Sequence, residues 1–299
     1  MIKTILITGK SGQLGQSFQK IALQNSELRT QYLFTFVGRE QLDLTCPQSI
    51  TDYFKDKHFD IIINCAAYTA VDKAETESEV ADQINHLAVK QLAEISRLNN
   101  SFFVHVSTDY VFDGMSHKPY VETDHTNPIN VYGLTKLKGE QAIQVSGCKG
   151  VIIRTSWVYS EFGNNFVKTM LRLGRERESL NVIYNQIGTP TYASDLARSI
   201  FVVLKKFADI DMVVSSKKQA IQIYHYSNEG VCSWYDFAKA IFEIGNVNCQ
   251  VNPIDAKDYP TPAKRPFYSL MDKSNIKQIS GLEVPYWRDN LALCLGQLK

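Results

Sequence analysis

Residues 8–15, with the sequence TGKSGQLG, contain the pattern that decides the fold. They follow the apolar run of residues 3–8 (KTILIT), which predicts a buried strand, and they overlap the start of a helix predicted for residues 12–23. Glycines spaced G-x-x-G-x-x-G between a strand and a helix are typical of a loop that binds a dinucleotide. One glycine permits the tight turn, the next lets backbone N–H groups approach a pyrophosphate, and Gly15 lets the helix pack closely on the strand. Because Lys10 lies inside the loop and not at its end, the pattern disfavours a nucleoside-triphosphatase P-loop.

The alternation of strand and helix continues to about residue 155. Further strands are predicted for residues 32–37 (YLFTFV), 60–65 (DIIINC), 101–107 (SFFVHVS) and 150–155 (GVIIRT), with helices over residues 47–57, 75–98 and 131–145. Strands and helices in this order form a parallel sheet with right-handed crossovers. The strands are apolar on both faces, which requires helices on each side of the sheet. We therefore expect an α/β fold of the Rossmann type, with a doubly wound parallel sheet.

The pattern changes after residue 156, where turn-forming residues become frequent, at 162–165 (FGNN), 188–190 (GTP) and 259–266 (YPTPAKRP). Loop-rich sequence of this kind predicts a smaller C-terminal substrate-binding domain over the carboxyl ends of the strands. The expected division is a dinucleotide-binding Rossmann domain of residues 1–155 plus about 191–222, and a substrate-binding region of about 156–190 and 223–299.

The composition excludes several classes of protein. The formal net charge is +1, so no strong field attracts nucleic acid or an anionic membrane. No run approaches about 18 uninterrupted apolar residues, and the apolar start is too short for a signal peptide. The cysteines form no C-x-x-C pair and the histidines no H-E-x-x-H motif, so we expect free thiols and no metal site. These features predict a cytoplasmic protein with neither nucleic-acid nor membrane partners.

A Tyr132-x-x-x-Lys136 pair opens the helix predicted for residues 131–145. The spacing places both side chains on one helical face. A phenol with a pKa of about 10 needs a nearby cation to act as an acid or base near neutrality, and Lys136 supplies it. Thr108 follows the fourth predicted strand, at the end of the sheet where open α/β folds bind ligands. A surface helix pair and a hydroxyl that caps its own backbone are the alternatives. The upstream glycine loop favours a catalytic trio of Tyr132, Lys136 and Thr108.

At this level of detail the chain resembles the dTDP-4-dehydrorhamnose reductases, a group of extended short-chain dehydrogenases/reductases. The resemblance extends over essentially the whole chain. Its blocks are residues 8–15 (TGKSGQLG), 66–75 (AAYTAVDKAE), 107–114 (STDYVFDG), 131–140 (VYGLTKLKGE), 154–159 (RTSWVY), 163–170 (GNNFVKTM), 186–197 (QIGTPTYASDLA), 233–238 (SWYDFA), 259–266 (YPTPAKRP) and 285–288 (PYWR).

The resemblance implies roles for individual residues. Tyr132 would donate the proton to the C4 oxygen of the sugar, Lys136 would modulate its pKa and hold the ribose, and Thr108 would take the place of the usual serine. Cofactor contacts are expected from Gly9, Gly12, Gln13, Leu14, Gly15, Arg39, Asp43, Leu44, Ala66, Ala67, Tyr68, Tyr132 and Lys136. Substrate contacts are expected from Val71, Thr108, Asp109, Trp157, Asn165 and Arg265, although Trp157 could equally be a packing residue.

The resemblance also implies the reaction, which is the NAD(P)H-dependent reduction of dTDP-4-dehydro-6-deoxy-L-mannose to dTDP-L-rhamnose, a precursor of surface polysaccharide. The alternatives are a reductase of another 4-keto-6-deoxy nucleotide sugar and a non-catalytic NADP-binding regulatory subunit. A dTDP-sugar is the expected partner, and the chain is expected to be a monomer or homodimer. Some members of the family are described with Mg²⁺, but the sequence offers no carboxylate cluster for it.

The cofactor preference depends on the residues after the second strand. A carboxylate at its end typically bonds the ribose of NAD, whereas an arginine meets the 2′-phosphate of NADP. Here Gly38 occupies the expected carboxylate position, and Arg39 and Glu40 follow it. We expect NADPH to be favoured, with NADH also used.

Overall fold

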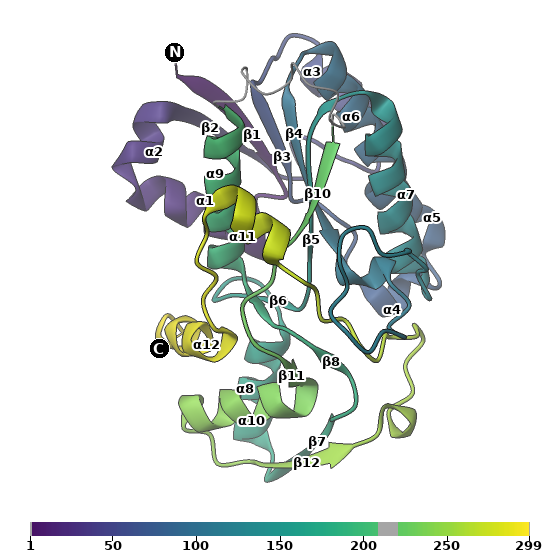
Figure 1. Ribbon diagram of the computed structural model, residues 1–299, viewed down its shortest axis with the longest axis vertical. Coiled ribbons are helices and arrows are strands. Elements are labelled where there is room, and N and C mark those ends of the chain that lie inside the picture. Colours follow the sequence, from purple (N-terminus) through teal and green to yellow (C-terminus); the bar gives the residue numbers. More distant parts are fainter. Residues whose placement is uncertain (1, 209–220, 299) are drawn as a thin grey trace.

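Six parallel strands form the central sheet of the computed structural model, which describes residues 2–208 and 221–298 (Figure 1). The strands are β1 (Lys3–Thr8), β2 (Tyr32–Val37), β3 (Ile61–Asn64), β4 (Phe102–Thr108), β5 (Lys149–Thr155) and β10 (Ile221–His225). Their order across the sheet is β10-β5-β4-β3-β1-β2, and every pairing is parallel. The chain moves outward from β1 to β2 and then returns to the other side of β1 as β3. Ligands of such sheets bind at this reversal, outside the carboxyl ends of the strands.

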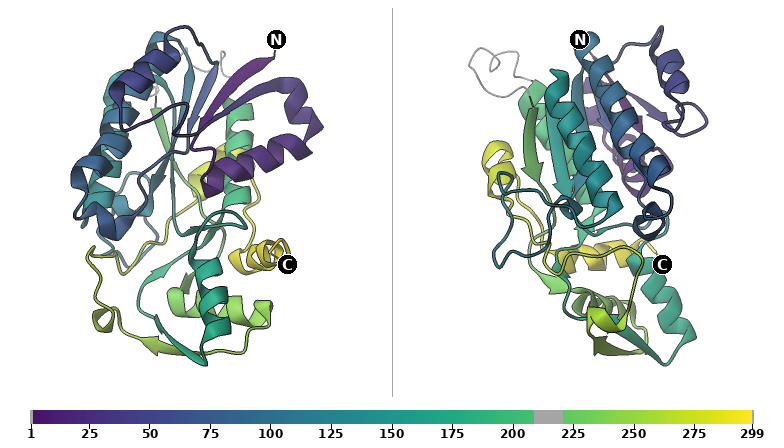
Figure 2. Two further views of the ribbon diagram at one scale, coloured as in Figure 1. Left: turned by 180° about the vertical axis from the view of Figure 1, so that it is seen from behind. Right: turned by 90° about the vertical axis from the view of Figure 1, so that its right-hand side faces the viewer.

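Helices cover both faces of the sheet (Figures 1 and 2). One face carries α1 (Gln13–Gln24), α2 (Ser26–Gln31), α9 (Ala193–Ala208) and α11 (Ser274–Ser280), and the other carries α3 (Pro47–Phe54), α5 (Ser78–Asp82), α6 (Ala88–Leu98) and α7 (Val131–Ser146). Alternate residues of β1 enter the two cores, with Ile5 and Ile7 on the α1/α9 face and Leu6 on the α6/α7 face. This architecture confirms the predicted doubly wound α/β fold.

The helix predicted for residues 75–98 is not one regular helix. The segment contains α5, a π-helical turn (η1, Gln83–Leu87) and α6, and the separate turn α4 (Val71–Ala74) precedes it. Within the wide turn, Asn85 bonds both backbone groups of Tyr68, at 2.9 and 3.1 Å. The π-helical turn therefore places the Asn85 side chain against the loop that follows β3. Such turns are frequent at functional sites.

The helix predicted for residues 47–57 is also shorter than expected. It ends at Phe54, which is its last buried residue, while residues 55–58 are exposed. Beyond Phe54 the segment has no apolar face to bury, and packing is what stabilises short helices in proteins.

A smaller region lies beyond the carboxyl ends of the central strands (Figures 1 and 2). Its own core is formed around buried residues such as Phe237 and Leu291. Its elements are β6 (Val158–Tyr159), α8 (Phe166–Glu176), β7 (Ser179–Ile183), β8 (Ile187–Gly188), β9 (Thr191–Tyr192), β11 (Cys232–Ser233), α10 (Trp234–Gly245), β12 (Gln250–Ile254), the 3₁₀ turn η4 (Ala256–Asp258) and α12 (Trp287–Gly296). Residues 209–220 of the expected second Rossmann segment lie outside the described residues, and α11, although late in the chain, packs against α9 and β10.

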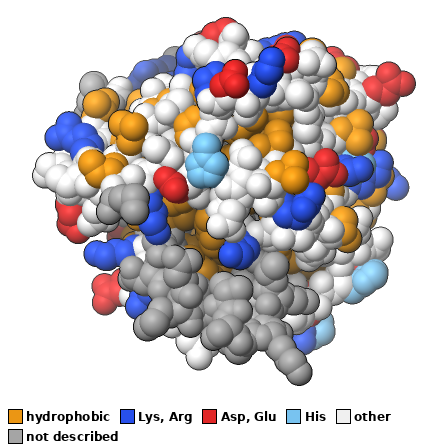
Figure 3. Space-filling view, turned by 90° about the horizontal axis from the view of Figure 1, so that it is seen from above, with side chains coloured by type: hydrophobic (Ala, Val, Ile, Leu, Met, Phe, Trp, Pro, Cys, Tyr) orange, Lys and Arg blue, Asp and Glu red, His pale blue; other side chains and the backbone are white. Residues whose placement is uncertain are grey.

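The opposite end of the molecule, seen from above in Figure 3, carries basic and acidic side chains that are interspersed. No patch of charges of a single sign covers the visible atoms of this face.

Among the described helices, none is both long and apolar enough to cross a membrane.

Candidate active site

The glycine loop between β1 and α1 folds as tightly as its sequence requires. Gly9 has a φ of +72°, and a Cβ there would lie 2.9 Å from the backbone nitrogen of Ala66. A Cβ on Gly15 would overlap the carbonyl oxygen of Gly9. Gly12 caps the N-terminus of α1 without a side chain, which leaves the first N–H groups of the helix open to a ligand.

A cavity of about 630 Å³ extends from this loop along the carboxyl ends of β1, β3 and β4. Of the thirteen residues predicted to bind the cofactor, all except Tyr68 line it: Gly9, Gly12, Gln13, Leu14, Gly15, Arg39, Asp43, Leu44, Ala66, Ala67, Tyr132 and Lys136. Tyr68 lies to the side, where its hydroxyl donates to Glu77 at 2.6 Å. The close backbone approach at Gly9, the open helix N-terminus and the Tyr132/Lys136 pair together fit a dinucleotide with a reactive nicotinamide.

Tyr132 and Lys136 of the predicted catalytic trio line one end of this cavity, and the Thr108 side chain is hydrogen-bonded to Tyr132. Burial raises the pKa of Tyr132 to about 12, and a hydrogen bond with the Thr108 side chain acts in the opposite direction. Burial lowers the pKa of Lys136 to about 8, against the charge of Glu140, which favours the ammonium. Lys136 Nζ donates to the carbonyl oxygen of Val106 at 2.7 Å. A buried lysine that titrates near neutrality beside a phenol is typical of a site for proton transfer.

A buried ion pair stands behind Lys136, and the sequence analysis did not identify it. Glu140, one helical turn after Lys136, accepts hydrogen bonds from Arg154 on β5 at 2.7, 3.0 and 3.2 Å, and from the Ser107 hydroxyl. Both charged side chains are almost fully buried. An arginine inside an otherwise apolar strand was the available signal, because a buried charge requires a partner.

Asp109 is buried beside the trio. Its Oδ1 accepts a hydrogen bond from the Thr108 hydroxyl at 3.0 Å, whereas its Oδ2 is buried without a hydrogen-bond partner in the described part of the chain. Burial raises the pKa of this carboxyl to about 6. A buried carboxylate oxygen without a donor is costly, and a ligand hydroxyl would satisfy it.

Two further predicted substrate contacts are occupied by other protein groups. The guanidinium of Arg265 donates to both oxygens of Asp72, at 2.7 and 3.1 Å. This bidentate ion pair joins α4 to the proline-rich segment, and the sequence analysis did not identify Asp72. Asn165 caps α8, accepting from the backbone of Lys168 at 3.2 Å. Its Nδ2 donates to Gln13 at 2.9 Å.

The last two predicted substrate contacts are half-buried. Val71 opens α4. Trp157 has a φ of +48°, and its ring stacks on Trp234 with centroids 3.6 Å apart. The stacking gives Trp157 a packing role, and its partial exposure leaves part of the side chain open to a ligand.

The adenosine end of the cavity carries paired charges. Arg39 is 76% exposed, and its Nε donates to Asp43 at 3.2 Å. Lys10 forms an ion pair with Glu40 and donates to Gln41 at 3.1 Å. Each cation therefore has a carboxylate neighbour. Both cations lie close to the end of β2, the position at which open α/β folds bond the adenosine ribose of a dinucleotide.

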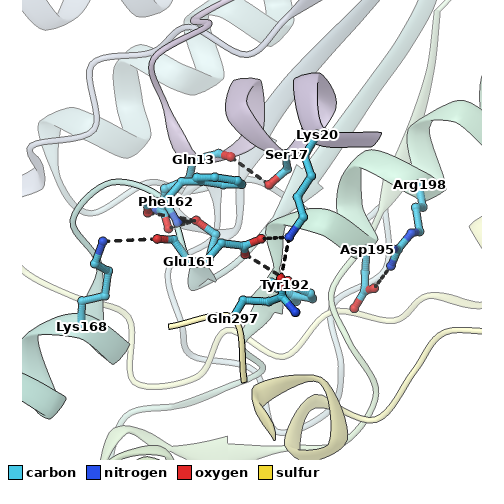
Figure 4. A network of polar contacts seen from close by, with 11 residues as sticks. Gln13, Ser17, Lys20, Glu161, Phe162, Lys168, Tyr192, Asp195, Arg198 and Gln297 are labelled. Atoms are coloured by element: carbon cyan, nitrogen blue, oxygen red, sulfur yellow. Dashed lines mark hydrogen bonds and ion pairs between the residues drawn. The ribbon is translucent and has the colours of Figure 1, made fainter. Parts of the chain in front are cut away.

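A second polar network joins the glycine loop and α1 to the smaller region (Figure 4). Lys20 of α1 donates to Glu161 at 2.7 Å, and Glu161 also accepts from the Tyr192 hydroxyl at 3.0 Å.

In the described residues no group of three or more His, Cys, Asp or Glu side chains could hold a metal ion. The donor set therefore does not fit Mg²⁺, and no step of the chemistry is assigned to a metal.

The fold and this site define an NAD(P)-dependent oxidoreductase of the short-chain dehydrogenase/reductase type. The family model described as the RmlD substrate binding domain matches residues 3–299, and the chain belongs to this family. A curated relative from Aggregatibacter actinomycetemcomitans, a dTDP-4-dehydrorhamnose reductase, is 42% identical over 294 residues, which cover 95% of each chain.

Solved structures agree with this assignment. A dTDP-4-dehydrorhamnose reductase from Clostridium acetobutylicum has a TM-score of 0.88 and 37% identity, and covers 99% of both chains. One from Bacillus anthracis, solved in complex with NADP, has the same TM-score and identity and covers 99% of this chain and 100% of its own. The family resemblance drawn from the sequence is thereby confirmed.

Proposed function

We propose that the protein reduces the C4 ketone of dTDP-4-dehydro-6-deoxy-L-mannose to give dTDP-L-rhamnose, with NADPH as the favoured reductant, as a cytoplasmic step in making a polysaccharide precursor. The observation that carries this proposal is the presence of Tyr132 and Lys136, with Thr108 hydrogen-bonded to Tyr132, at a cavity that twelve of the thirteen predicted cofactor contacts line. The names of the relatives support the choice of substrate.

A reduced nicotinamide held in the cavity would supply the hydride. The glycine loop holds the pyrophosphate with backbone N–H groups and the N-terminus of α1. Tyr132 donates its phenolic proton to the ketone oxygen as that oxygen gains charge, and the Lys136 ammonium stabilises the resulting phenolate. The hydroxyl of Thr108 turns its hydrogen from Asp109 Oδ1 to the same oxygen and holds it in line with Tyr132. Asp109 Oδ2 accepts a hydrogen bond from a sugar hydroxyl, which supplies its missing donor.

The positions of the other predicted substrate contacts support the roles that we propose for them. Arg265 meets the diphosphate with the guanidinium edge that Asp72 leaves open, because an arginine fork holds phosphate oxygens in fixed geometry. Val71 and the exposed part of Trp157 form apolar walls for the sugar. Asn165 contributes from the start of α8, where it is tied to the cofactor loop through Gln13.

The test is to mix the purified protein with NADPH and the keto-sugar nucleotide and follow the oxidation of NADPH at 340 nm. NMR of the product then identifies the configuration at C4. Tyr132→Phe is the matched control, because it removes the proton and keeps the ring; turnover should fall by about 10²–10⁴-fold. A product with the other C4 configuration would indicate a different 4-keto sugar reductase. Binding of NADPH without any turnover would indicate a regulatory subunit.

A further inference from the structure

Three buried polar side chains lie side by side on β1, β3 and β4, next to Lys136. Thr8 on β1, Asn64 on β3 and His105 on β4 are paired in register, and each is at most 2% exposed. The adjacent row on the same face, Leu6, Ile62 and Phe103, is apolar. Buried polar groups in a sheet core are costly unless they bond to one another, so this row calls for a function beyond packing.

The row is a continuous chain of hydrogen bonds that ends on Lys136. The Thr8 hydroxyl donates to Asn64 Oδ1 at 2.6 Å. Asn64 Nδ2 faces His105 Nδ1 at 3.1 Å, and His105 Nε2 lies 3.1 Å from Lys136 Nζ. The chain therefore extends from the glycine loop, where Thr8 also lines the cofactor cavity, to the amine beside Tyr132.

The first member of the chain fixes the direction of the rest. Thr8 Oγ1 accepts the backbone N–H of Ala66 at 3.2 Å, so its own hydrogen goes to Asn64 Oδ1. The amide of Asn64 then presents N–H to His105 Nδ1, which must accept. Burial and the neighbouring Lys136 lower the pKa of His105 well below its ordinary value, so the ring is neutral and carries one hydrogen. That hydrogen lies on Nε2 and points at Lys136 Nζ.

We infer that Thr8, Asn64 and His105 are positioning residues that set the proton affinity of Lys136, because the ring N–H of His105 bonds the neutral amine and opposes the ammonium. This inference rests on the proposed function for its kinetic consequence. The other groups that face Lys136 favour the ammonium: the carbonyl oxygen of Val106, which accepts from Nζ at 2.7 Å, Glu140 on α7, and Cys65, which follows β3. The hydrogen-bond chain and burial both lower the proton affinity of Lys136 and so oppose these groups. Their combined effect keeps the pKa of Lys136 near the working pH, where an acid or base transfers protons most efficiently.

The first test determines, without substrate, in which direction the hydrogen bonds from Thr8 to Lys136 are donated. Histidines labelled with ¹⁵N report by NMR which ring nitrogen carries the hydrogen, and His105→Gln identifies the signal of His105. At pH 9 we expect the Nε2–H tautomer in the wild type. In Asn64→Asp a carboxylate accepts from both neighbours, so the ring should change to the Nδ1–H tautomer. An Nδ1–H ring in the wild type would overturn the inference, whether or not the protein is a reductase.

The second test reads Lys136 through the pH profile of kcat/KM for reduction. Asn64→Asp reverses the ring and places the Nε2 acceptor of His105 opposite Lys136, and the uncharged His105→Phe removes the opposing N–H, so the alkaline limb should move up by about one pH unit in both variants. His225→Gln is the control, because His225 is equally buried but bonds the carbonyl oxygen of Tyr120, and its limb should stay in place. An unmoved limb in both folded Asn64 and His105 variants would refute the inference.

Discussion

Asn165 Nδ2 donates a hydrogen bond to Gln13 Oε1 at 2.9 Å, across 152 residues of sequence. Gln13 belongs to the glycine loop, which is predicted to hold the pyrophosphate, and Asn165 is the N-cap of α8 in the smaller region. Ser160 donates to the same oxygen at 3.0 Å. The cofactor loop and the predicted substrate region are therefore joined by a side-chain bond, and the position of one constrains the other.

Replacement of Asn165 should separate this link from the helix cap. Asn165→Ala removes both, so the free energy of unfolding should fall by about 1 kcal/mol and KM for the sugar nucleotide should rise. Asn165→Asp keeps the capping oxygen and loses the N–H donors. It should retain stability while its KM for the sugar rises more than its KM for NADPH. Denaturant unfolding and steady-state kinetics measure the two effects, and an unchanged KM in the aspartate variant would assign Asn165 to capping alone.

Thr108 should contribute through its hydroxyl and not through its shape. Thr108→Val is isosteric and removes the donor to the ketone oxygen, so kcat should fall by at least tenfold, the cost of about one hydrogen bond to a developing charge. Thr108→Ser keeps the donor and should retain most of the turnover. The kinetics of the two variants side by side decide the point, since equal activity of the valine variant and the wild type would show a packing role.

Asp109 should make stability depend on pH in an unusual direction. Burial raises the pKa of its carboxyl from 3.8 to about 6 in the folded protein. A raised pKa gives stability that is complete below pH 4 and is lost as the pH rises through 6, because the unfolded chain releases the proton first. Asp109→Asn cannot ionise, so at pH 7 it should be more stable than the wild type by roughly 2–3 kcal/mol.

Urea unfolding of wild type and Asp109→Asn at pH 4 and pH 7 tests this. The difference between the two proteins should be larger at pH 7 than at pH 4. The same variant should bind the sugar nucleotide more weakly, because an amide nitrogen cannot accept a hydroxyl hydrogen where Oδ2 does. A difference in stability that is the same at both pH values would show that the carboxyl does not ionise in this range.

Local sequence patterns were sufficient for five of the six strands of the sheet and for the glycine loop, whereas β10 was not among the strands predicted for the sheet. The strands are short apolar runs, and Gly15 is required by the carbonyl oxygen of Gly9 within the same turn. Gly9 itself is required by its φ of +72° and by the backbone of Ala66, which follows β3. The π-helical turn at residues 83–87 could not be predicted, because it depends on a tertiary bond from Asn85 to Tyr68.

The parts of the site that could not be predicted from the sequence also depend on tertiary contacts. Cofactor contacts cluster because they follow consecutive strands, so their sequence positions predict their place. The partners Asp72 for Arg265 and Glu140 for Arg154 come from segments that only the folded chain brings together. The position of Arg154 in an otherwise apolar strand indicated that a buried partner exists, but the sequence did not identify that partner.

We expect the cofactor preference to depend on the two ion pairs beside the end of β2, Arg39 with Asp43 and Lys10 with Glu40. The contact of Arg39 with Asp43 uses Nε, so the guanidinium can still present N–H groups to a 2′-phosphate. Arg39→Ala should therefore lower kcat/KM for NADPH by about 10–100-fold, as the loss of a hydrogen bond to a charged group predicts, and should leave NADH nearly unaffected. Arg39→Lys keeps the charge without the fork and should lie between.

Glu40 should act against NADPH, since it pairs with Lys10 and adds a negative charge beside the phosphate position. Glu40→Gln releases Lys10 from its partner and removes the repulsion, so the ratio of kcat/KM for NADPH to that for NADH should rise, while the Arg39 variant lowers it. The measurement is kcat/KM with each cofactor at a saturating concentration of the sugar nucleotide, for wild type and the three variants. A wild-type preference for NADH, or equal losses with both cofactors in Arg39→Ala, would contradict the assignment of this corner to the 2′-phosphate.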